Sequence, residues 1–303
     1  MRVDVPVDVA CHVNVLVPDL AEPGLTRALG ALADLGYSHV VLPPIDPEAD
    51  PLARWAARFR DSGLSPITIA GQAPGADVSS ADPHEQERGA AALRRVVDAT
   101  VALGGDQMNG VSYGLFGRAA TTSTREAFER SAAHLGAVAD HAHDRGVTMT
   151  FEVLNRYETA LVNTAQQALD FVAASGSDHL RVHLDTFHMA VEEADMLGAI
   201  RSAVPVLGYL ELGQSGRGPL ASGSVDAEAV VREAIRAGYR GRIGVEAFSR
   251  SVLSEVASDL LAIWREPYTD GRALAAEAID VVRRGEAAAG EPDGGVTGSG
   301  AGR

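Results

Sequence analysis

Four acidic residues in the second half of the chain each lie near the end of an apolar run of β-forming residues. They are Glu152 in TMTFEVLNR, Asp185 in RVHLDTFHM, Glu211 in VLGYLELGQ and Glu246 in RIGVEAFSR. Successive members are about one strand–helix unit apart, which is the repeat of a (β/α)8 barrel, and the carboxyl ends of its parallel strands meet at one mouth. We therefore expect the four side chains to converge there.

Converging carboxylates need a cation between them, because like charges at short range otherwise disfavour ionisation. Oxygen ligands suit a hard divalent ion, so the sequence predicts one metal ion per chain, Mn²⁺ first, with Mg²⁺ or Co²⁺ as alternatives. Any single acidic residue at a strand end could instead be a helix N-cap. The repetition of all four in phase with the strands favours the metal site.

The composition excludes several classes of protein. The 303 residues carry a formal net charge of −15 and contain one cysteine, Cys11. An acidic chain without a basic footprint does not favour a nucleic-acid partner, and no apolar run reaches the roughly 18 residues of a membrane span. All 26 Lys+Arg residues are arginine, which excludes Schiff-base and pyridoxal phosphate chemistry, since both need a lysine amine. With one cysteine and no signal-peptide pattern, we expect a cytoplasmic protein.

Strand and helix patterns alternate eight times, which favours a closed (β/α)8 TIM barrel over an open sheet. We predict the first strand at 10–17, the sixth helix near 191–204 and a final helix at 273–284. No G-x-G-x-x-G follows the first strand, so a dinucleotide-binding sheet is not supported. The sequence thus predicts one barrel domain over residues 1–285, followed by a disordered Gly-rich tail at 286–303.

Several segments resemble the ketose 3-epimerases of the D-tagatose/D-psicose 3-epimerase type, which belong to the xylose isomerase-like barrels. They are FEVLNRYE, NTAQQALDFV, HLDTFHMAVEE, LGQSGRGPLASGSVD, EAIRAGYRGRIGVEAF and AIWRE. The similarity is dense from about 146 to 265. It implies a xylose isomerase-like TIM barrel that epimerises a keto-sugar, removing a proton next to the carbonyl through an enediolate.

The resemblance also implies a role for each matching residue. Glu152 and Glu246 would be metal ligands and the acid/base pair on opposite faces of the substrate carbon, and Asp185 would be a third ligand. The residues that would hold substrate oxygens are Glu158, His188 and Arg217. Independently of the resemblance, removal of a proton next to a carbonyl is helped by a metal that stabilises the resulting charge. Epimerisation needs a second carboxyl group on the other face to return the proton.

Two residues depart from the family pattern. Glu211 stands where the family has a histidine as its fourth metal ligand, and Gln214 stands where the family has a glutamate. Four-carboxylate sites are chemically reasonable, so we expect Glu211 to be a ligand; the alternative is that it turns away to pair with an arginine. His188 could instead be satisfied by backbone at a helix entrance, and Arg217 could be a surface loop cation. His183, on the strand face of the third ligand, is expected to pack behind the ligands.

Three functions remain open from the sequence. The first is the keto-sugar epimerase. The second is a metal-dependent lyase that acts on an oxidised (keto) glycoside by α-proton abstraction and β-elimination, which the absence of bulky aromatics in CHVNVLVPD would suit. The third is a non-catalytic sugar-binding subunit with a decayed metal site at Glu211. In each case we expect a small carbohydrate as partner, neither nucleic acid nor membrane, and a homo-oligomer, either a dimer or a tetramer.

Overall fold

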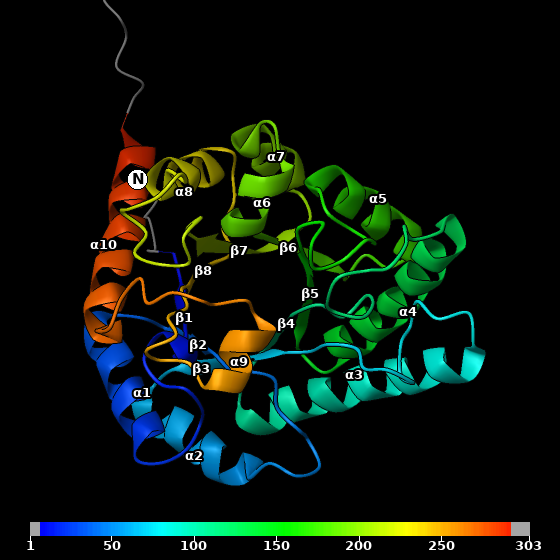
Figure 1. Ribbon diagram of the computed structural model, residues 1–303, viewed down its shortest axis with the longest axis horizontal. Helices are drawn as coiled ribbons and strands as arrows, with labels where there is room; N and C mark the ends of the chain where they lie inside the picture. The colour runs from blue at the N-terminus through cyan, green and yellow to red at the C-terminus, as the bar shows by residue number, and fades with distance from the viewer. Residues whose placement is uncertain (1–6, 292–303) are drawn as a thin grey trace, which may run out of the picture.

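Eight parallel strands, paired in sequence order and closed by pairing of the first with the last, form a barrel in residues 7–291, the part of the chain that this computed structural model describes (Figure 1). The strands are β1 (Val9–His12), β2 (His39–Val41), β3 (Ser65–Ile69), β4 (Gln107–Asn109), β5 (Thr148–Val153), β6 (Arg181–Asp185), β7 (Leu207–Gly213) and β8 (Arg242–Glu246). The predicted (β/α)8 barrel is confirmed.

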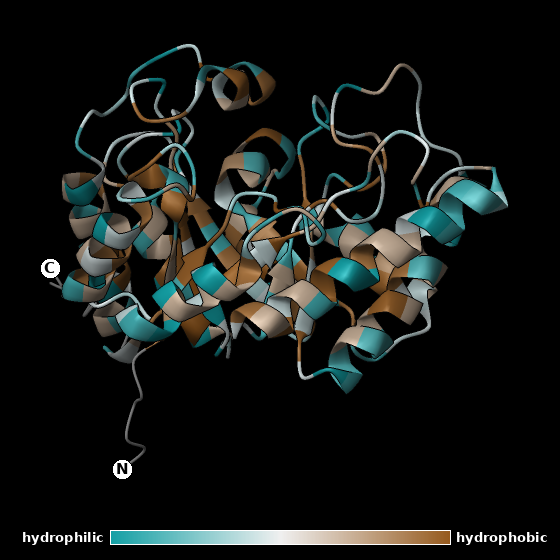
Figure 2. Cartoon of the chain, turned by 90° about the horizontal axis from the view of Figure 1, so that it is seen from below, coloured by the Kyte–Doolittle hydropathy of each residue, from teal (hydrophilic) through white to brown (hydrophobic). Residues whose placement is uncertain are grey.

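Helices surround this barrel and connect its strands (Figure 1). They are α1 (Gly24–Leu35), α2 (Leu52–Ser62), α3 (Pro83–Leu103), α4 (Arg125–Asp144), α5 (Ala165–Ser175), α6 (Thr186–Glu192), α7 (Met196–Ala203), α8 (Ala227–Arg236), α9 (Glu255–Leu260) and α10 (Gly271–Gly290). Figure 2 shows the apolar strands at the centre, with polar segments along the outer helices. This arrangement buries both faces of the sheet, as parallel strands require.

The core has two parts. The larger part lies between the barrel and the helices, where Phe151 of β5 packs against Phe171 of α5 with ring centroids 4.9 Å apart. The smaller part fills the barrel interior and consists of Ala10, Val41, Ile67 and Tyr209. This inner layer fills the barrel beneath its mouth, so polar side chains nearer the carboxyl ends of the strands lie above packed apolar side chains.

Strand register aligns the acidic residues at the mouth. Asp185 of β6 pairs in register with Glu211 of β7, and Gly213 of β7 pairs with Glu246 of β8. A Cβ at Gly213 would lie 2.7 Å from Oδ1 of Asp185, which is too close for any larger residue. Asp185 also begins α6 as its N-cap, because its Oδ1 accepts a hydrogen bond of 2.9 Å from the backbone N–H of Phe187. Asp185 is therefore both a helix N-cap and one of the acidic residues at the mouth, so the two interpretations given for such a residue do not exclude each other.

Some element boundaries differ from the prediction. The first strand ends at His12 and continues as a 3-10 turn over Val13–Val15, instead of running to residue 17. The single helix predicted near 191–204 is two helices, because Asp195 starts α7 as an N-cap that accepts from the N–H of Gly198. The short helix α9, which lies in front of the strands in Figure 1, was not predicted.

The boundary of the predicted tail was wrong. The sequence predicts disorder from residue 286, whereas α10 continues to Gly290. Glu286 is held in place because its Oε1 accepts a hydrogen bond of 2.6 Å from the N–H of Val7, and Arg283 donates to its other oxygen. The rest of the predicted tail, residues 292–303, lies outside the described residues. No helix in the described part of the chain has the length and apolar character needed to cross a membrane.

Candidate active site

A cavity of about 730 Å³ opens at the carboxyl ends of the strands. Two buried carboxylates, Asp185 and Glu211, lie beneath it with 0% and 1% of their surfaces exposed. Among the residues that line it are five of the predicted site residues, Glu152, Glu158, His188, Arg217 and Glu246. The structure therefore brings all seven predicted site residues to one end of the barrel.

The four carboxylates alternate with four nitrogen-bearing side chains around the mouth. We call this set the carboxylate–base ring. In order around the mouth, it consists of Glu152, His188, Asp185, Arg217, Glu246, His12, Glu211 and His183. Each nitrogen group lies between two carboxylates, which reduces the mutual repulsion that the four carboxylates would otherwise have.

One half of the ring lies between β5 and β8. Nε2 of His188 is 3.3 Å from Oε1 of Glu152 and 3.5 Å from Oδ2 of Asp185. Nη1 of Arg217 is 3.4 Å from Oδ2 of Asp185 and contacts Oε2 of Glu246. Cations or N–H donors therefore bridge each pair of neighbouring carboxylates on this side.

The other half of the ring is centred on Glu211. Nε2 of His12 is 2.9 Å from Oε1 of Glu211 and 3.7 Å from Oε1 of Glu246. Nε2 of His183 is 3.1 Å from Oε2 of Glu211, and His183 also groups with Glu152, with potential ligand atoms within 4.8 Å. Glu211 thus faces two histidines, and the alternative that it turns away to pair with an arginine is wrong.

Three groups of side chains in the described residues have donor atoms close enough to share a metal ion. They are His12 with Glu211 and Glu246, Glu152 with Asp185 and His188, and Glu152 with His183 and Glu211. The groups overlap through Glu152 and Glu211. The mouth of the barrel is therefore a possible metal site, built from carboxylate oxygens and imidazole nitrogens.

The geometry around His188 fixes its tautomer. Its Nδ1 accepts a hydrogen bond of 3.1 Å from the backbone N–H of Asn155 and lies 2.8 Å from Nδ2 of the same residue. A nitrogen that accepts from a backbone N–H carries no proton of its own, so the proton of the neutral ring is on Nε2, which faces Glu152 and Asp185. Asn155 also donates to Oε1 of Glu158 at 3.0 Å. The backbone contact predicted as the alternative for His188 is present, and it orients the ring towards the site.

Arg217 is held in the loop after β7 by its backbone and by two aromatic rings. Its φ of 56° is in the left-handed region, which is uncommon for a residue other than glycine. Its N–H donates to the carbonyl of Gln214 at 2.7 Å, and its carbonyl accepts from the N–H of Phe248 at 2.8 Å. Its guanidinium carbon lies 3.5 Å from the centroid of Phe187, within cation–π range. The side chain is 11% exposed, so Arg217 is not a surface cation.

Gln214 satisfies backbone groups of the same loop. Its Nε2 donates to the carbonyls of Leu220 and Val225, at 3.0 and 2.9 Å. Its Oε1 accepts from the N–H groups of Ser215 and Val225, each at 2.9 Å. A glutamate could not donate to the two carbonyls. The departure from the family pattern at this position therefore matches a structural role in the loop that carries Arg217.

The environments of Glu152 and Glu246 move their pKa values in opposite directions. Burial raises the pKa of Glu246 to about 7, although Arg217 and His12 partly oppose this. Burial also acts to raise the pKa of Glu152, but His183 and His188 outweigh it and leave the pKa below its usual value. One carboxyl group of the cavity is thus set to be ionised at neutral pH, while the other is poised to hold or release a proton.

The histidines next to Glu211 favour its ionised form. Burial opposes ionisation, but His12 and His183 hold the pKa of Glu211 well below its usual range. For His12, burial lowers the pKa, but Glu211 outweighs this effect and raises the pKa to about 9. Glu211 is therefore an ion-paired carboxylate with a proton-bearing partner on β1.

Sequence reasoning missed two residues of the site, His12 and Asn155. His12 ends the first apolar strand, so the rule that selected the four carboxylates, a polar residue at a strand end, would also have selected it. Asn155 lies three residues after Glu152 in FEVLNRYE, where only the structure reveals its contact with His188. Both contacts join side chains of different strand–loop units, which spacing along the chain does not show.

Apolar side chains from three loops cover the outer part of the cavity. The lining residues there are Pro43, Pro44, Ile45, Pro47, Val111, Phe116, Leu253, Ala257, Leu260 and Leu261. β1 and the segment after it contribute His12, Asn14 and Pro18, with no Phe, Tyr or Trp among them. The polar ring thus lies at the inner end of a mostly apolar entrance.

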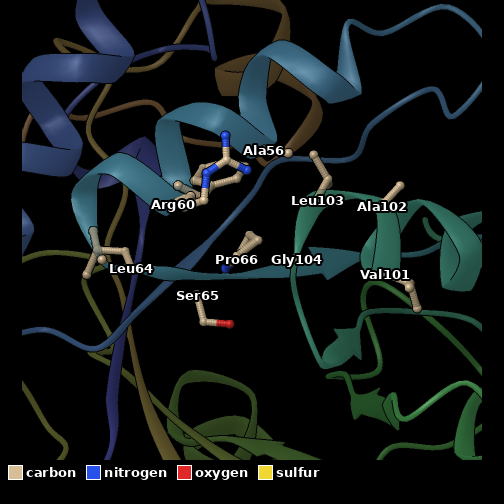
Figure 3. Close-up of a pocket in the computed structure, with 11 residues that line it drawn as sticks. Ala56, Arg60, Leu64, Ser65, Pro66, Val101, Ala102, Leu103 and Gly104 are labelled. Carbon is tan, nitrogen blue, oxygen red and sulfur yellow. The ribbon is translucent and has the colours of Figure 1, made fainter.

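A second hollow, of about 410 Å³, lies at the opposite end of the barrel (Figure 3). Its walls come from the end of α2, the start of β3 and the end of α3, and include Arg60, Leu64, Pro66 and Val101. Arg60 is the one charged side chain among its lining residues, and no carboxylate or histidine faces it there. Catalytic groups of such barrels gather at the carboxyl ends of the strands, so the chemistry belongs to the first cavity.

Comparisons with known proteins agree with this geometry. Residues 29–284 match the family model of the xylose isomerase-like TIM barrel. The chain is 36% identical over 270 residues to the L-ribulose 3-epimerase of Mesorhizobium japonicum, covering 89% of this chain and 91% of the relative. It is 34% identical to a ketose 3-epimerase of Arthrobacter globiformis, with coverage of 91% and 95%. A solved structure of the D-allulose 3-epimerase from Methylomonas sp. in complex with D-allulose superposes with a TM-score of 0.87 at 31% identity, covering 92% of this chain and 97% of that one.

Proposed function

Because this chain belongs to the xylose isomerase-like TIM barrel family, and within it to the ketose 3-epimerases, we propose that it epimerises a free ketose at C3 with the help of one divalent metal ion. The relatives act on L-ribulose, on ketoses or on D-psicose, as their names state. A ketopentose or ketohexose fits within a cavity of about 730 Å³. This substrate class is the first one to test.

The proposed metal ligands are the four carboxylates of the ring, Glu152, Asp185, Glu211 and Glu246. The donor set fits a hard divalent ion, because it consists mainly of oxygen atoms with imidazoles at the edge. The overlapping groups of donor atoms at the barrel mouth support this assignment. When bound, a divalent ion supplies charge stabilisation to a carbonyl oxygen from which a neighbouring proton is being removed. We propose Mn²⁺, with Mg²⁺ or Co²⁺ as the alternatives.

The observation that carries the proposal is that two carboxyl groups, Glu152 and Glu246, line one cavity. Glu152 is on β5 and Glu246 is on β8, with β6 and β7 between them, so the two reach the cavity from different sides. We assign the ionised Glu152 as the base and Glu246, whose pKa lies at about 7, as the acid that returns the proton to the other face. Proton transfer is most efficient when the pKa of the group is near the working pH.

Three further side chains would position the sugar. Glu158 and the Nε2–H of His188 lie on the β5 and β6 side of the cavity, and Arg217 lies on the β7 side. Two of them can donate to sugar oxygens and Glu158 can accept from hydroxyl groups. Their positions around the carboxylate–base ring support a substrate held with its polar end inward.

The epimerase interpretation is favoured over the two alternatives. The 3-epimerase relatives cover about nine tenths of the chain. By contrast, the 3-dehydro-D-guloside 4-epimerase of Escherichia coli, which acts on a keto-glycoside by its name, is 26% identical over 33% of the chain. A non-catalytic binding protein would have no need for two carboxyl groups that reach one cavity from different strands.

An assay of ketopentoses and ketohexoses with added Mn²⁺ in deuterated water tests the proposal. We expect a C3 epimer that carries deuterium at C3. A product formed by loss of a substituent, with deuterium next to the carbonyl, would support the lyase instead. Binding of sugar without exchange in the metal-loaded protein would support the non-catalytic alternative.

The proposal also includes a cytoplasmic homo-oligomer. Cys11 is buried, which suits a reducing compartment in which no disulfide is needed. Large apolar side chains are exposed near the mouth, among them Tyr157, Leu260 and Trp264, at 66%, 68% and 66%. A subunit interface would cover such side chains, and analytical ultracentrifugation would measure the state directly.

A further inference from the structure

His12 is the ring member that no predicted role accounts for. Its side chain is 5% exposed, and it lines the cavity at the end of β1. Its ring and that of Phe248 form a T-shaped pair, with ring centroids 6.1 Å apart and planes at 88°. These contacts hold the imidazole in one place, with Nε2 between the carboxylates of Glu211 and Glu246.

We propose that His12 is a ligand of the divalent ion, so that β1 and β7 together supply a histidine–glutamate pair on one side of the metal site. This inference rests on the proposed function for the presence of the ion. It adds a nitrogen donor to the four carboxylates and places that donor on a strand where no site residue was expected.

The spacing of the donor atoms supports this assignment. Two donors that each lie about 2.1 Å from an ion, at an angle of 90° to 110°, are roughly 3.0 to 3.5 Å apart. Nε2 of His12 is 2.9 Å from Oε1 of Glu211 and 3.7 Å from Oε1 of Glu246. These two separations bracket the range, so small movements suffice for the three atoms to share one ion.

The other nitrogen side chains of the ring are less suited to bind the ion. Arg217 has no lone pair to offer. His188 uses the lone pair of Nδ1 to accept from the backbone of Asn155, so its Nε2 carries the proton that faces the carboxylates. To bind a metal through Nε2, His188 would have to give up the backbone hydrogen bond at Nδ1, whereas the Nε2 proton that His12 holds against Glu211 is released when an ion binds. His188 is therefore a partner of the carboxylates and of the substrate.

His183 is the remaining competitor, and its depth argues against it. It pairs in register with Tyr209, which belongs to the apolar layer inside the barrel, and the two rings pack edge to face at 4.8 Å. His12, by contrast, lines the cavity. An ion that must contact a substrate lies on the cavity side. Nε2 of His183 lies 3.1 Å from the second oxygen of Glu211.

The charge balance also favours a nitrogen donor. Four carboxylates around a divalent ion leave an excess of negative charge in a buried site, which is costly. A neutral imidazole adds a donor without adding a further negative charge. His12 thus adds a donor to the group around the ion without adding negative charge.

Pulsed EPR of the Mn²⁺-loaded protein tests the proposal without relying on activity. A directly bound imidazole gives a ¹⁴N modulation of the Mn²⁺ echo, and we expect it in the natural protein and in the variants His183→Gln and His188→Gln. His12→Gln should lose it and bind Mn²⁺ at least about tenfold more weakly. His39→Gln is the matched control, because His39 is a buried strand histidine that contacts Ser38 and belongs to none of the metal-capable groups.

A charge-swapped variant guards against simple loss of folding. His12→Glu alone should weaken Mn²⁺ binding strongly, and the double variant His12→Glu with Glu211→His should recover most of the affinity and the ¹⁴N signal. Nitrogen modulation that persists in His12→Gln but vanishes in His183→Gln overturns the assignment. Tight Mn²⁺ binding with no ¹⁴N signal in the natural protein overturns it as well and leaves the epimerase proposal standing. A ¹⁴N signal that depends on His12, without turnover of any ketose, supports the ligand and contradicts the epimerase.

Discussion

At the scale of single residues, the alternation of carboxylates and nitrogen bases explains how so many titratable groups share one barrel mouth. Asp185 and Glu211 are almost fully buried, and each has a nitrogen group on either side in the ring. Burial raises the pKa of Glu246, whereas at Glu152 the neighbouring His183 and His188 outweigh burial and lower the pKa. The balance between burial and neighbouring bases therefore differs between these two carboxyl groups.

Removing either member of the proposed acid/base pair should abolish most of the turnover. We expect Glu152→Gln and Glu246→Gln each to lower kcat by roughly 10²- to 10⁴-fold, because each replacement removes a proton-transfer group and leaves the shape of the side chain. Steady-state kinetics on the best ketose, with circular dichroism of each variant, would measure this. Glu255→Gln, which changes an exposed glutamate at the start of α9, should have no effect. Retention of a tenth of kcat in either site variant would contradict the pair.

At the scale of elements, the positions of the strands could be predicted from the sequence. Some element boundaries, and the contacts between side chains of different strands, could not. Each acidic strand end could be located because β-forming runs are local in sequence. The division between α6 and α7 depends on the Asp195 cap, and the early end of β1 depends on the 3-10 turn after His12. The spacing of apolar residues predicts neither feature. The contacts of His12 with Glu211 and of Asn155 with His188 join separate strand units, so only the closed barrel reveals them.

The loop between β7 and α8 should depend on the amide of Gln214. Gln214→Glu would place a buried carboxylate against the carbonyls of Leu220 and Val225, and unsatisfied buried groups cost about 1–3 kcal/mol each. We therefore expect a loss of about 2–4 kcal/mol in the free energy of unfolding, together with weaker substrate binding because Arg217 is in the same loop. Urea unfolding would measure the loss. Gln166→Glu, at an exposed position of α5, is the control; equal stability of the two variants would refute the role of Gln214.

At the scale of the whole molecule, the two ends of the described chain are joined beside the barrel. Figure 1 shows α10 alongside α1 and α8, and Arg283 and Glu286 of α10 bind the backbone of Val7 just before β1. The amino ends of the strands form the closed, structural side of the barrel, while the site is at the carboxyl ends. Stability and chemistry can therefore be tested at opposite ends of the molecule.

The amino-terminal side should confer a dependence of stability on pH through His39. Burial, together with the positive charge of Arg242, lowers the pKa of His39 to about 4, so the folded state favours the neutral ring. Between the unfolded pKa of about 6.5 and this value, the unfolded state binds more protons, and stability falls as pH falls. The contribution of one such group is at most about 1.4 kcal/mol per pH unit. Unfolding of His39→Gln between pH 7 and pH 4 should show a shallower loss than the natural protein. An unchanged slope would contradict this, and His84→Gln, at an exposed histidine of α3, should leave the slope as it is.

The carboxyl-terminal side should confer a dependence of stability on metal. An ion that binds only the folded state stabilises it by about 2.7 kcal/mol at a hundred times its dissociation constant, because the unfolded chain does not bring the ring together. For a domain of this size we expect Mn²⁺ to raise the Tm by at least about 5 °C over protein treated with a chelator. Asp185→Asn and Glu211→Gln should each reduce this increase, since each removes an anionic donor from the group around the ion, while Glu255→Gln should keep it whole. Scanning calorimetry at fixed protein concentration would make the comparison. Superimposable curves with Mn²⁺ and with chelator, in the natural protein, would contradict a metal at the mouth and with it the chemistry assigned to Glu152 and Glu246.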